Sequence, residues 1–531
     1  MYLLFPGRHH LMTDFQFNYL FRTIHSKLSE MEDVLGKPLT VNTEIEGVVF
    51  AVTSSNHAGT KRNPLPFHLR AMMIQEFSRE LSVPSFVYGI EDIGYSEDFA
   101  SYTLKSIAHA SDHTIQLTPE NTIVVCSTKV MDLYMNLGFQ ILPAELVDRE
   151  KEIYGHAMPW DVIVAISKAQ SWKNDDFVMS NIHSSSFKIW DNYKLADSVK
   201  TLFNDPIIGD DGDITESRDY NSYVRQMDEI AELKYNDTAP YVRVGNVGDI
   251  GCAVGSWIKL ACADKRLLDC DFYGIEVTRK LYDICNQRKH NGEFENPAVF
   301  FAMKNAVTDL VFEKSAMDTI HTSSLTHEIE SYGSHNDLLK FIENRYAELK
   351  NGGVWINRDV VGPEDGDALV LMRLEEKDGS NKEVFKQFED SYELTKHLNG
   401  LSTYALFLRF GEDFRKVEGK QINYEKCVVN NESCIRLKKK DAADFLLTKD
   451  YTDNWYSEMH ETFCFWSFTD WKQALEEVGF KIQPVSNAYQ NPWIAENRWF
   501  GKASLFENNE AQLVPIAFPP TNMLLIAEKI A

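Results

Sequence analysis

The segment at residues 249–255 combines a carboxylate with closely spaced glycines, a pattern able to hold a small polar ligand. It reads Asp-Ile-Gly-Cys-Ala-Val-Gly and joins a hydrophobic stretch to a predicted helix. Gly251 and Gly255 allow the backbone to approach a ligand closely, and the start of a helix offers N–H groups that lack partners within the helix. Taken alone, the string also fits an ordinary tight turn between a strand and a helix.

Four further segments follow this loop in one order and at one set of spacings. Glu276 ends the next predicted strand, where a carboxylate can accept hydrogen bonds from both hydroxyls of a ribose. Asn305 and Ala306 lie where a loop after the third strand would contact an adenine. His327 and Asp359 follow the fourth and fifth predicted strands. One set of spacings shared by all these elements is far more specific than any single motif.

This series resembles the class I S-adenosylmethionine-dependent methyltransferases from about residue 220 to the end of the chain. The resemblance implies a seven-stranded, doubly wound sheet with S-adenosylmethionine lying across the carboxyl ends of its first strands. Two positions depart from the usual pattern, because Ala253 replaces the middle glycine and Asn305 replaces an acidic residue. The resemblance assigns cofactor binding to Asp249, Gly251, Cys252, Gly255, Glu276, Asn305 and Ala306.

A base is needed for methyl transfer only if the acceptor carries a proton with a high pKa. The candidates are His327, Asp359 and His460. His327 lies just after the fourth predicted strand, and His460 belongs to an aromatic-rich stretch that could wall an acceptor pocket. Each histidine is equally compatible with a purely structural role. The methyl acceptor is expected to be a small molecule or a nucleotide-linked group.

A second motif follows the first predicted strand, at residues 7–16. It reads Gly-Arg-His-His-Leu-Met-Thr-Asp-Phe-Gln, and an arginine, Arg70, follows an Asn-Pro pair further along the chain. These residues resemble the nicotinamide-nucleotide adenylyltransferase group of HIGH-type nucleotidyltransferases over roughly residues 1–200. The resemblance implies a nucleoside triphosphate with Mg²⁺ as a ligand of this part. It assigns nucleotide binding to Gly7, Arg8, His10, Thr13, Gln16 and Arg70.

The departures from this second family concern its catalytic groups. Its two motif histidines neutralise charge on the transferring phosphates, and here their positions are held by Thr13 and Gln16. The family's last motif is replaced by residues 154–160, which lack its hydroxyls and its arginine. Three interpretations stay open: a diverged or lost transferase, a partner activity in one biosynthetic pathway, and a module that presents a nucleotide or an RNA end to the methyltransferase.

Predicted strands and helices alternate on both sides of an Asp-, Gly- and Pro-rich seam. Alternation of this kind favours parallel sheets covered by helices, so we expect an α/β chain with two doubly wound, Rossmann-like domains. The first helix is predicted over residues 15–35. We place a nucleotidyltransferase-like domain at residues 1–203, a linker at 204–218 and the methyltransferase domain at 219–531, with an α+β insertion at about 372–455.

Composition limits the partners. The formal net charge of −25 disfavours long duplex nucleic acid and anionic membranes. Eight cysteines without a paired CxxC spacing indicate reduced thiols, and the sequence assigns no metal ligands. The amino-terminal residues lack a basic lead and a long apolar run, so we expect a cytoplasmic protein without a signal peptide or a membrane anchor. The oligomeric state is left open.

Overall fold

The computed structural model describes residues 1–40, 43–205, 209–212, 220–388, 390–509 and 511–530, with the side chains described from residue 227 in the helix that begins at Tyr220. Two compact units divide between Gly212 and Asp213. The sequence places a linker at 204–218, of which residues 206–208 and 213–218 lie outside the described residues. Within the described residues, no helix is both long and apolar enough to cross a membrane.

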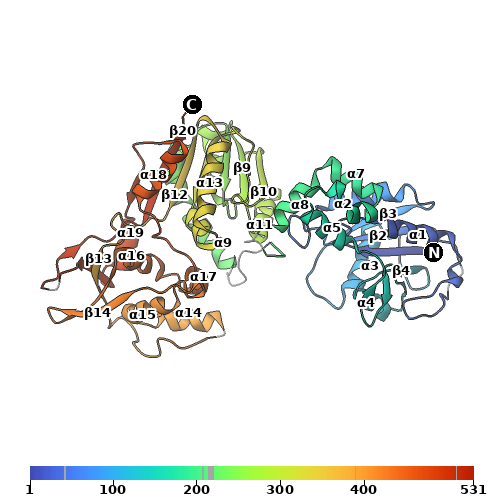
Figure 1. Cartoon of the computed structure of the whole chain (residues 1–531), viewed down its shortest axis with the longest axis horizontal. Coiled ribbons are helices and arrows are strands. Elements are labelled where there is room, and N and C mark those ends of the chain that lie inside the picture. The colour runs from blue at the N-terminus through green and yellow to red at the C-terminus, as the bar shows by residue number, and fades with distance from the viewer. Residues whose placement is uncertain (41–42, 206–208, 213–219, 389, 510, 531) are drawn as a thin grey trace. The chain divides into compact units, whose positions relative to one another are not determined.

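The amino-terminal unit contains a five-stranded parallel sheet in the order β3-β2-β1-β4-β5 (Figure 1). Its strands are β1 (Tyr2–Gly7), β2 (Gly47–Thr53), β3 (Ser85–Ile90), β4 (Thr122–Val125) and β5 (Gln140–Leu142). Every residue of β2 except the last is buried, as expected for a strand covered on both faces. Two apolar clusters, one built on Leu3 and Phe50 and one on Leu4 and Val49, divide these alternating side chains between the faces.

Helices connect and extend this sheet. They are α1 (Asp14–His25), α2 (Phe67–Ser78), α3 (Phe99–Ala110), α4 (Met131–Asn136), α5 (Pro159–Lys168), α6 (Asp176–Asn181), α7 (Ser184–Asn192) and α8 (Leu195–Phe203), and a short hairpin is formed by β6 (Leu146–Asp148) and β7 (Ile153–Tyr154). The prediction of one helix over residues 15–35 is wrong at its carboxyl end. The chain turns extended at Ser26, and a tight turn at residues 33–36 is closed by the Asp33 side chain.

The second unit is built on an eight-stranded sheet in the order β10-β9-β8-β11-β12-β20-β16, with β17 also paired to β20. The first five strands of this order are parallel, whereas β20 runs antiparallel to β12. The strands are β8 (Asn246–Ile250), β9 (Asp271–Glu276), β10 (Val299–Met303), β11 (Met317–Ser323), β12 (Leu349–Asp359), β16 (Phe480–Ile482), β17 (Asn487–Tyr489) and β20 (Asn522–Lys529).

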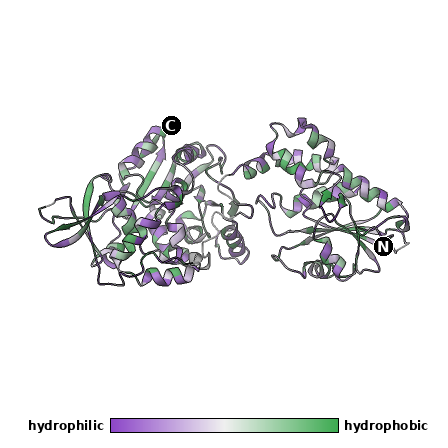
Figure 2. Cartoon of the chain, turned by 60° about the horizontal axis from the view of Figure 1, so that its bottom comes forward, coloured by the Kyte–Doolittle hydropathy of each residue, from purple (hydrophilic) through white to green (hydrophobic). Residues whose placement is uncertain are grey.

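Amphipathic helices cover the two faces of this sheet, and Figure 2 shows hydrophilic and hydrophobic residues alternating along them. Trp355 and Leu525 point into one apolar cluster, and Ile356 and Ile526 point into the other. The helices are α9 (Tyr220–Thr238), α10 (Ser256–Ala263), α11 (Arg279–His290), α12 (Thr326–Tyr332), α13 (His335–Glu348) and α18 (Phe468–Val478). Since the parallel strands all end at one edge, the loops that follow them share that edge.

A cap with its own sheet and apolar core interrupts this fold twice (Figure 1). The sequence places one insertion at about 372–455, but the cap takes two segments, because β13 pairs on one side with β15 and on the other with the distant β18. The first segment holds β13 (Leu369–Leu374), α14 (Ser391–Asn399), α15 (Thr403–Asp413), β14 (Tyr424–Val429), β15 (Glu432–Lys438), α16 (Lys439–Thr448) and α17 (Trp455–Glu458), and the second holds α19 (Pro492–Ile494), β18 (Ala503–Glu507) and β19 (Pro515–Ile516).

Gly274 in β9 offers a test of this packing. A Cβ at this position would lie 2.5 Å from the ring of Phe301 and 3.0 Å from the Cys252 sulfur. We expect Gly274→Ala to lower the free energy of unfolding by about 1–3 kcal/mol, because overpacking forces neighbours to move. Gly400→Ala is the control, since its Cβ would meet no atom closer than 3.3 Å and its φ is −87°. Equal urea midpoints for the two variants would contradict the packing described here.

Candidate active site

The loop between β8 and α10 adopts left-handed backbone conformations at alternate residues. Gly251, Ala253 and Gly255 have φ angles of 72°, 48° and 75°. Ala253 therefore holds the conformation that the replaced glycine would favour, at the cost of some backbone strain. The amides of Gly251 and Cys252 donate to the Ile275 carbonyl over 2.8 and 3.1 Å, which fixes the loop against the end of β9.

Asp249 is held at the end of β8 by a neighbouring strand. Its Oδ1 lies 2.7 Å from Nδ1 of His321, and both side chains are buried. The His321 ring stacks on Trp257, with centroids 4.1 Å apart and an interplanar angle of 11°. The indole N–H of Trp257 in turn donates to Thr238 over 2.8 Å. The orientation of this carboxylate is therefore set by strand β11 and by helices α9 and α10.

Glu276 ends β9, and its carboxylate is buried and bound by backbone amides. Oε1 accepts from Val277 and Thr278, each over 2.8 Å, and Oε2 accepts from Ala253 over 2.9 Å. Burial raises the pKa of Glu276 to about 7, against the effect of these amides. Oε2 keeps capacity for a further hydrogen bond, because a carboxylate oxygen can accept two.

The loop after β10 contains Asn305 and Ala306. The Asn305 side-chain oxygen accepts from the Val307 amide over 2.9 Å, which closes a local turn. Ala306 is buried, and its carbonyl accepts from Arg345 over 3.4 Å. Arg345 itself forms a fully buried ion pair with Glu348. Helix α13 therefore holds this loop in place through Arg345.

His327 and Asp359 form a buried pair at the ends of β11 and β12. His327 Nδ1 lies 2.6 Å from Asp359 Oδ1, and its Nε2 lies 3.4 Å from Glu461 Oε2. Burial lowers the pKa of His327, but the charges of Asp359 and Glu461 outweigh it and hold this pKa well above its ordinary value. The pKa of Asp359 is about 2, because the His327 charge and several hydrogen bonds overcome burial. Asp359 therefore orients His327 and has little affinity for a proton.

Two charged groups that the sequence does not single out share this edge. Glu461 is the neighbour of His460 and is 3% exposed, whereas the half-buried His460 ring lies near Tyr332, with centroids 6.3 Å apart. Burial lowers the pKa of Lys234 to about 8, and the charges of Asp249, Asp359 and Glu328 act on the same ammonium group. The loop at residues 249–255 and the His327–Asp359 pair therefore act on a common charged group, Lys234 of α9.

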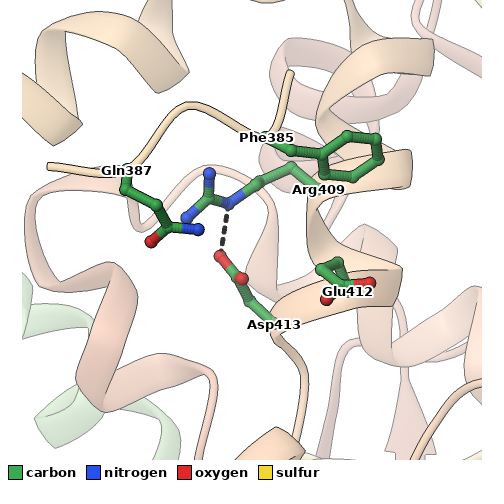
Figure 3. Close-up of a pocket in the computed structure, with 5 residues that line it drawn as sticks. All are labelled: Phe385, Gln387, Arg409, Glu412 and Asp413. Carbon is green, nitrogen blue, oxygen red and sulfur yellow. Dashed lines mark hydrogen bonds and ion pairs between the residues drawn. The ribbon is translucent and has the colours of Figure 1, made fainter. Parts of the chain in front are cut away.

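The cavity drawn in Figure 3 lies elsewhere in this unit. It has a volume of ≈ 290 Å³ and lies in the cap, between α15 and residues 385–387. Its buried Arg409 donates to Asp413 and to the carbonyls of Val384 and Lys386. Asp413 also accepts from the Trp455 indole over 2.9 Å. These contacts tie residues 384–386 and Trp455 to α15 within the cap.

In the amino-terminal unit, Thr13 and Gln16 form a capping box at the start of α1. Gln16 N donates to Thr13 Oγ1, and Thr13 N donates to Gln16 Oε1. Gln16 also donates to the buried Glu145 over 2.8 Å. Both side chains at the positions of the family's motif histidines therefore serve the fold. The Thr-x-x-Gln spacing is a recognised sequence signal for such a box.

The other predicted nucleotide-binding residues lie around the end of β1. Arg70 is fully buried and donates to the carbonyls of Arg8, Thr53, Ser54 and His57, so its guanidinium joins the segments that follow β1 and β2. The exposed Arg8 follows Gly7.

His10 is 3% exposed, with Asn63 beside it. Within the part of the chain that the structure describes, neither of its ring nitrogens has a hydrogen-bond partner.

No family model and no curated protein matches the sequence. Among solved structures, the YcgJ protein from Bacillus subtilis is 14% identical, with a TM-score of 0.29, and the match covers 57% of this chain and 99% of that one. An S-adenosylmethionine-dependent methyltransferase from Clostridium acetobutylicum is 11% identical, with a TM-score of 0.29 and coverage of 59% and 100%. At these sequence identities and TM-scores, neither likeness indicates an activity for this chain.

The buried carboxylate of Glu276 predicts a pH dependence of stability. Its folded pKa of about 7 exceeds its ordinary value of 4.5, so between these values the folded protein holds a proton that the unfolded chain has lost. The free energy of unfolding should therefore fall as the pH rises through this window, by at most about 3 kcal/mol. Glu276→Gln should lack this contribution.

Urea unfolding of the ligand-free protein between pH 4.5 and 8 measures the effect. The difference between wild type and Glu276→Gln should move in favour of the variant as the pH rises and then level off. The exposed Glu313→Gln is the matched control, for which we expect a curve parallel to that of the wild type. A constant difference for Glu276→Gln would show that the carboxylate is already ionised at low pH.

Proposed function

We propose that the chain is an S-adenosylmethionine-dependent methyltransferase that acts on a small-molecule or nucleotide-linked acceptor. The observation that carries the proposal is the shared edge at the carboxyl ends of β8, β9, β11 and β12. This edge holds the loop in which every second residue is left-handed, the buried carboxylate of Glu276 and the His327–Asp359–Glu461 cluster. A nucleoside site beside an acid–base cluster suits methyl transfer to a bound acceptor that must lose a proton.

The residues present fit the cofactor. Asp249 is a buried carboxylate able to accept from an ammonium group, and the strained backbone at Ala253 shows that the loop keeps its shape without the middle glycine. Glu276 retains acceptor capacity for ribose hydroxyls, and Asn305 lies at the adenine end. When bound, S-adenosylmethionine supplies an electrophilic methyl group on a positively charged sulfur. Lys234 and Arg358 bring positive charge to the same edge.

The side of the site that would face the methyl acceptor is lined by polar side chains that their neighbours hold in place, which we call the acceptor wall. Asp359 fixes the His327 ring, Phe463 packs edge-on against that ring with centroids 5.0 Å apart, and Tyr332 donates to Glu461 over 3.1 Å. We assign acceptor binding to His327, Glu328 and Glu461. Because Asp359 is fixed by its many donors, we assign it a positioning role. His460 is replaced in this assignment by its neighbour Glu461.

Calorimetric titration of the full chain with S-adenosylhomocysteine tests the cofactor site. We expect binding, and at about 100 times the dissociation constant a gain of roughly 2.7 kcal/mol in stability. Asp249→Asn keeps an oxygen for His321 but removes the charge, and should weaken binding at least about tenfold, as for a charge-assisted hydrogen bond worth about 1.5–3 kcal/mol. The exposed Asp269→Asn is the control. A wild-type protein with neither heat nor a melting shift would refute the proposal.

For the amino-terminal unit we propose a nucleotidyltransferase-like, Rossmann-type domain that binds a nucleotide with transfer diverged or lost. His10 supports a ligand here, because its ring is buried beside Asn63 and the charges of Arg8 and Arg70 act on it. Thr13 and Gln16 support the loss of transfer, because both are occupied in capping the helix and neither carries charge. Binding of a nucleoside triphosphate with Mg²⁺ is part of this proposal.

Removal of one preorganised donor from a charge-stabilising site typically costs about a hundred- to a thousandfold in rate. Incubation with nicotinamide mononucleotide and ATP should therefore release no pyrophosphate above background. ATP should still raise the melting temperature of the unit, and Arg8→Ala should reduce that shift. Arg22→Ala, exposed on α1, is the control and should not. Rapid pyrophosphate release that Arg8→Ala abolishes would show that the missing histidines are not required.

A further inference from the structure

Three metal-ligating side chains converge beside the candidate acceptor wall. The ligand atoms of His327, Glu328 and Glu461 all lie within 4.8 Å of one another. His327 and Glu461 are 6% and 3% exposed, and Glu328 is partly exposed. Two of the groups belong to α12 and the third belongs to the loop after α17 in the cap, so the fold brings them together over a long stretch of chain.

In His327 and Glu461, the side-chain atom that would not bind a cation already has a hydrogen-bond partner. Asp359 Oδ1 lies 2.6 Å from His327 Nδ1, which keeps a proton on Nδ1, so Nε2 is the nitrogen that would bind a cation in exchange for its own proton. Metal-bound histidines are commonly oriented in this way by a carboxylate. Tyr332 donates to Glu461 Oε1 over 3.1 Å, while the other oxygen, Oε2, is the one that lies 3.4 Å from His327 Nε2. Both buried ligands therefore point one atom at a common position.

The charges at this position also favour a cation. Asp359, Glu328 and Glu461 bring three carboxylates to the cluster, against one imidazole and the ammonium group of Lys234. Buried charges need compensation, because their separation from water is costly. A divalent cation between the carboxylates would compensate their negative charge. The His327 side chain alone would not, because three carboxylates carry more charge than one imidazole can balance.

We infer that His327, Glu328 and Glu461 bind one divalent cation. A mixed set of one imidazole and two carboxylates suits Mn²⁺, Fe²⁺ or Zn²⁺ better than Mg²⁺ or Ca²⁺, which prefer oxygen ligands alone. Three protein ligands leave coordination positions open, as in catalytic sites. If the proposed methyltransferase function holds, an open position would take an oxygen of the acceptor, so the acceptor would be a hydroxyl or carboxylate compound. The cation site itself does not depend on that function.

Titration of the chelator-treated full chain with Mn²⁺, followed by the electron paramagnetic resonance of the free ion, tests the inference. We expect one site per chain. Glu461→Gln and Glu328→Gln each remove one anionic ligand and should weaken binding at least about tenfold, and Asp359→Asn should weaken it about 10- to 100-fold through His327. Glu330→Gln is the matched control, because its carboxylate lies on the same helix but pairs with His335. Circular dichroism checks that each variant is folded.

The outcomes separate this inference from the proposed function. Absence of Mn²⁺ and Zn²⁺ binding by the wild type at millimolar concentration overturns the cation site, as does equal affinity in Glu461→Gln, Glu328→Gln and Glu330→Gln. S-adenosylhomocysteine binding in a sample that binds no cation overturns the cation site alone. Cation binding that Glu461→Gln weakens, in a chain that does not bind S-adenosylhomocysteine, upholds the cation site and overturns the methyltransferase.

Discussion

The geometry of the candidate site depends on the buried carboxylate of Asp359 at the end of β12. Its Oδ2 accepts from the Thr326 amide over 2.7 Å and from the Thr326 hydroxyl over 2.6 Å, so it sets where α12 begins. Its Oδ1 fixes His327 and accepts from the Val360 amide over 2.8 Å. One ionised side chain thereby joins a central strand, a helix start and the first residue of the connection to the cap.

A second buried carboxylate holds the cap side of the same site. Asp444 in α16 accepts from the amides of Phe463 and Cys464 over 2.9 and 3.1 Å, and burial raises its pKa to about 7. These amides lie just after Glu461, so the position of the Glu461 side chain is set by the cap core. The candidate site is therefore built from the core sheet and from the cap, with Asp359 fixing the first part and Asp444 fixing the second.

Local sequence signals predicted the parts of the site that follow strands. Asp249 and Glu276 are found this way because a parallel sheet places strand ends at one edge. Glu461 and Lys234 could not be found in this way. They reach the candidate site because the cap and α9 pack against the sheet edge, and such packing requires no fixed sequence spacing from the strand ends. The two-part cap was missed for the same reason, since the pairing of β13 with β18 has no local signature. In the amino-terminal unit, Thr13 and Gln16 were seen as departures from a family, although their spacing also encodes a helix cap.

The double interruption of the sheet has a consequence for how this unit can fold during synthesis. β12 lacks its partner β20 until residue 529 has been made, and β13 lacks β18 until residue 507 has been made. The core and the cap therefore each wait for strands that are made about 130 to 170 residues after their partners, and an open strand edge is exposed in both until then. Because long-range pairing is slow, the emerging unit depends on late closure of two sheets at nearly the same time. A ribosome-bound chain would present both edges to chaperones before the core sheet and the cap sheet are complete.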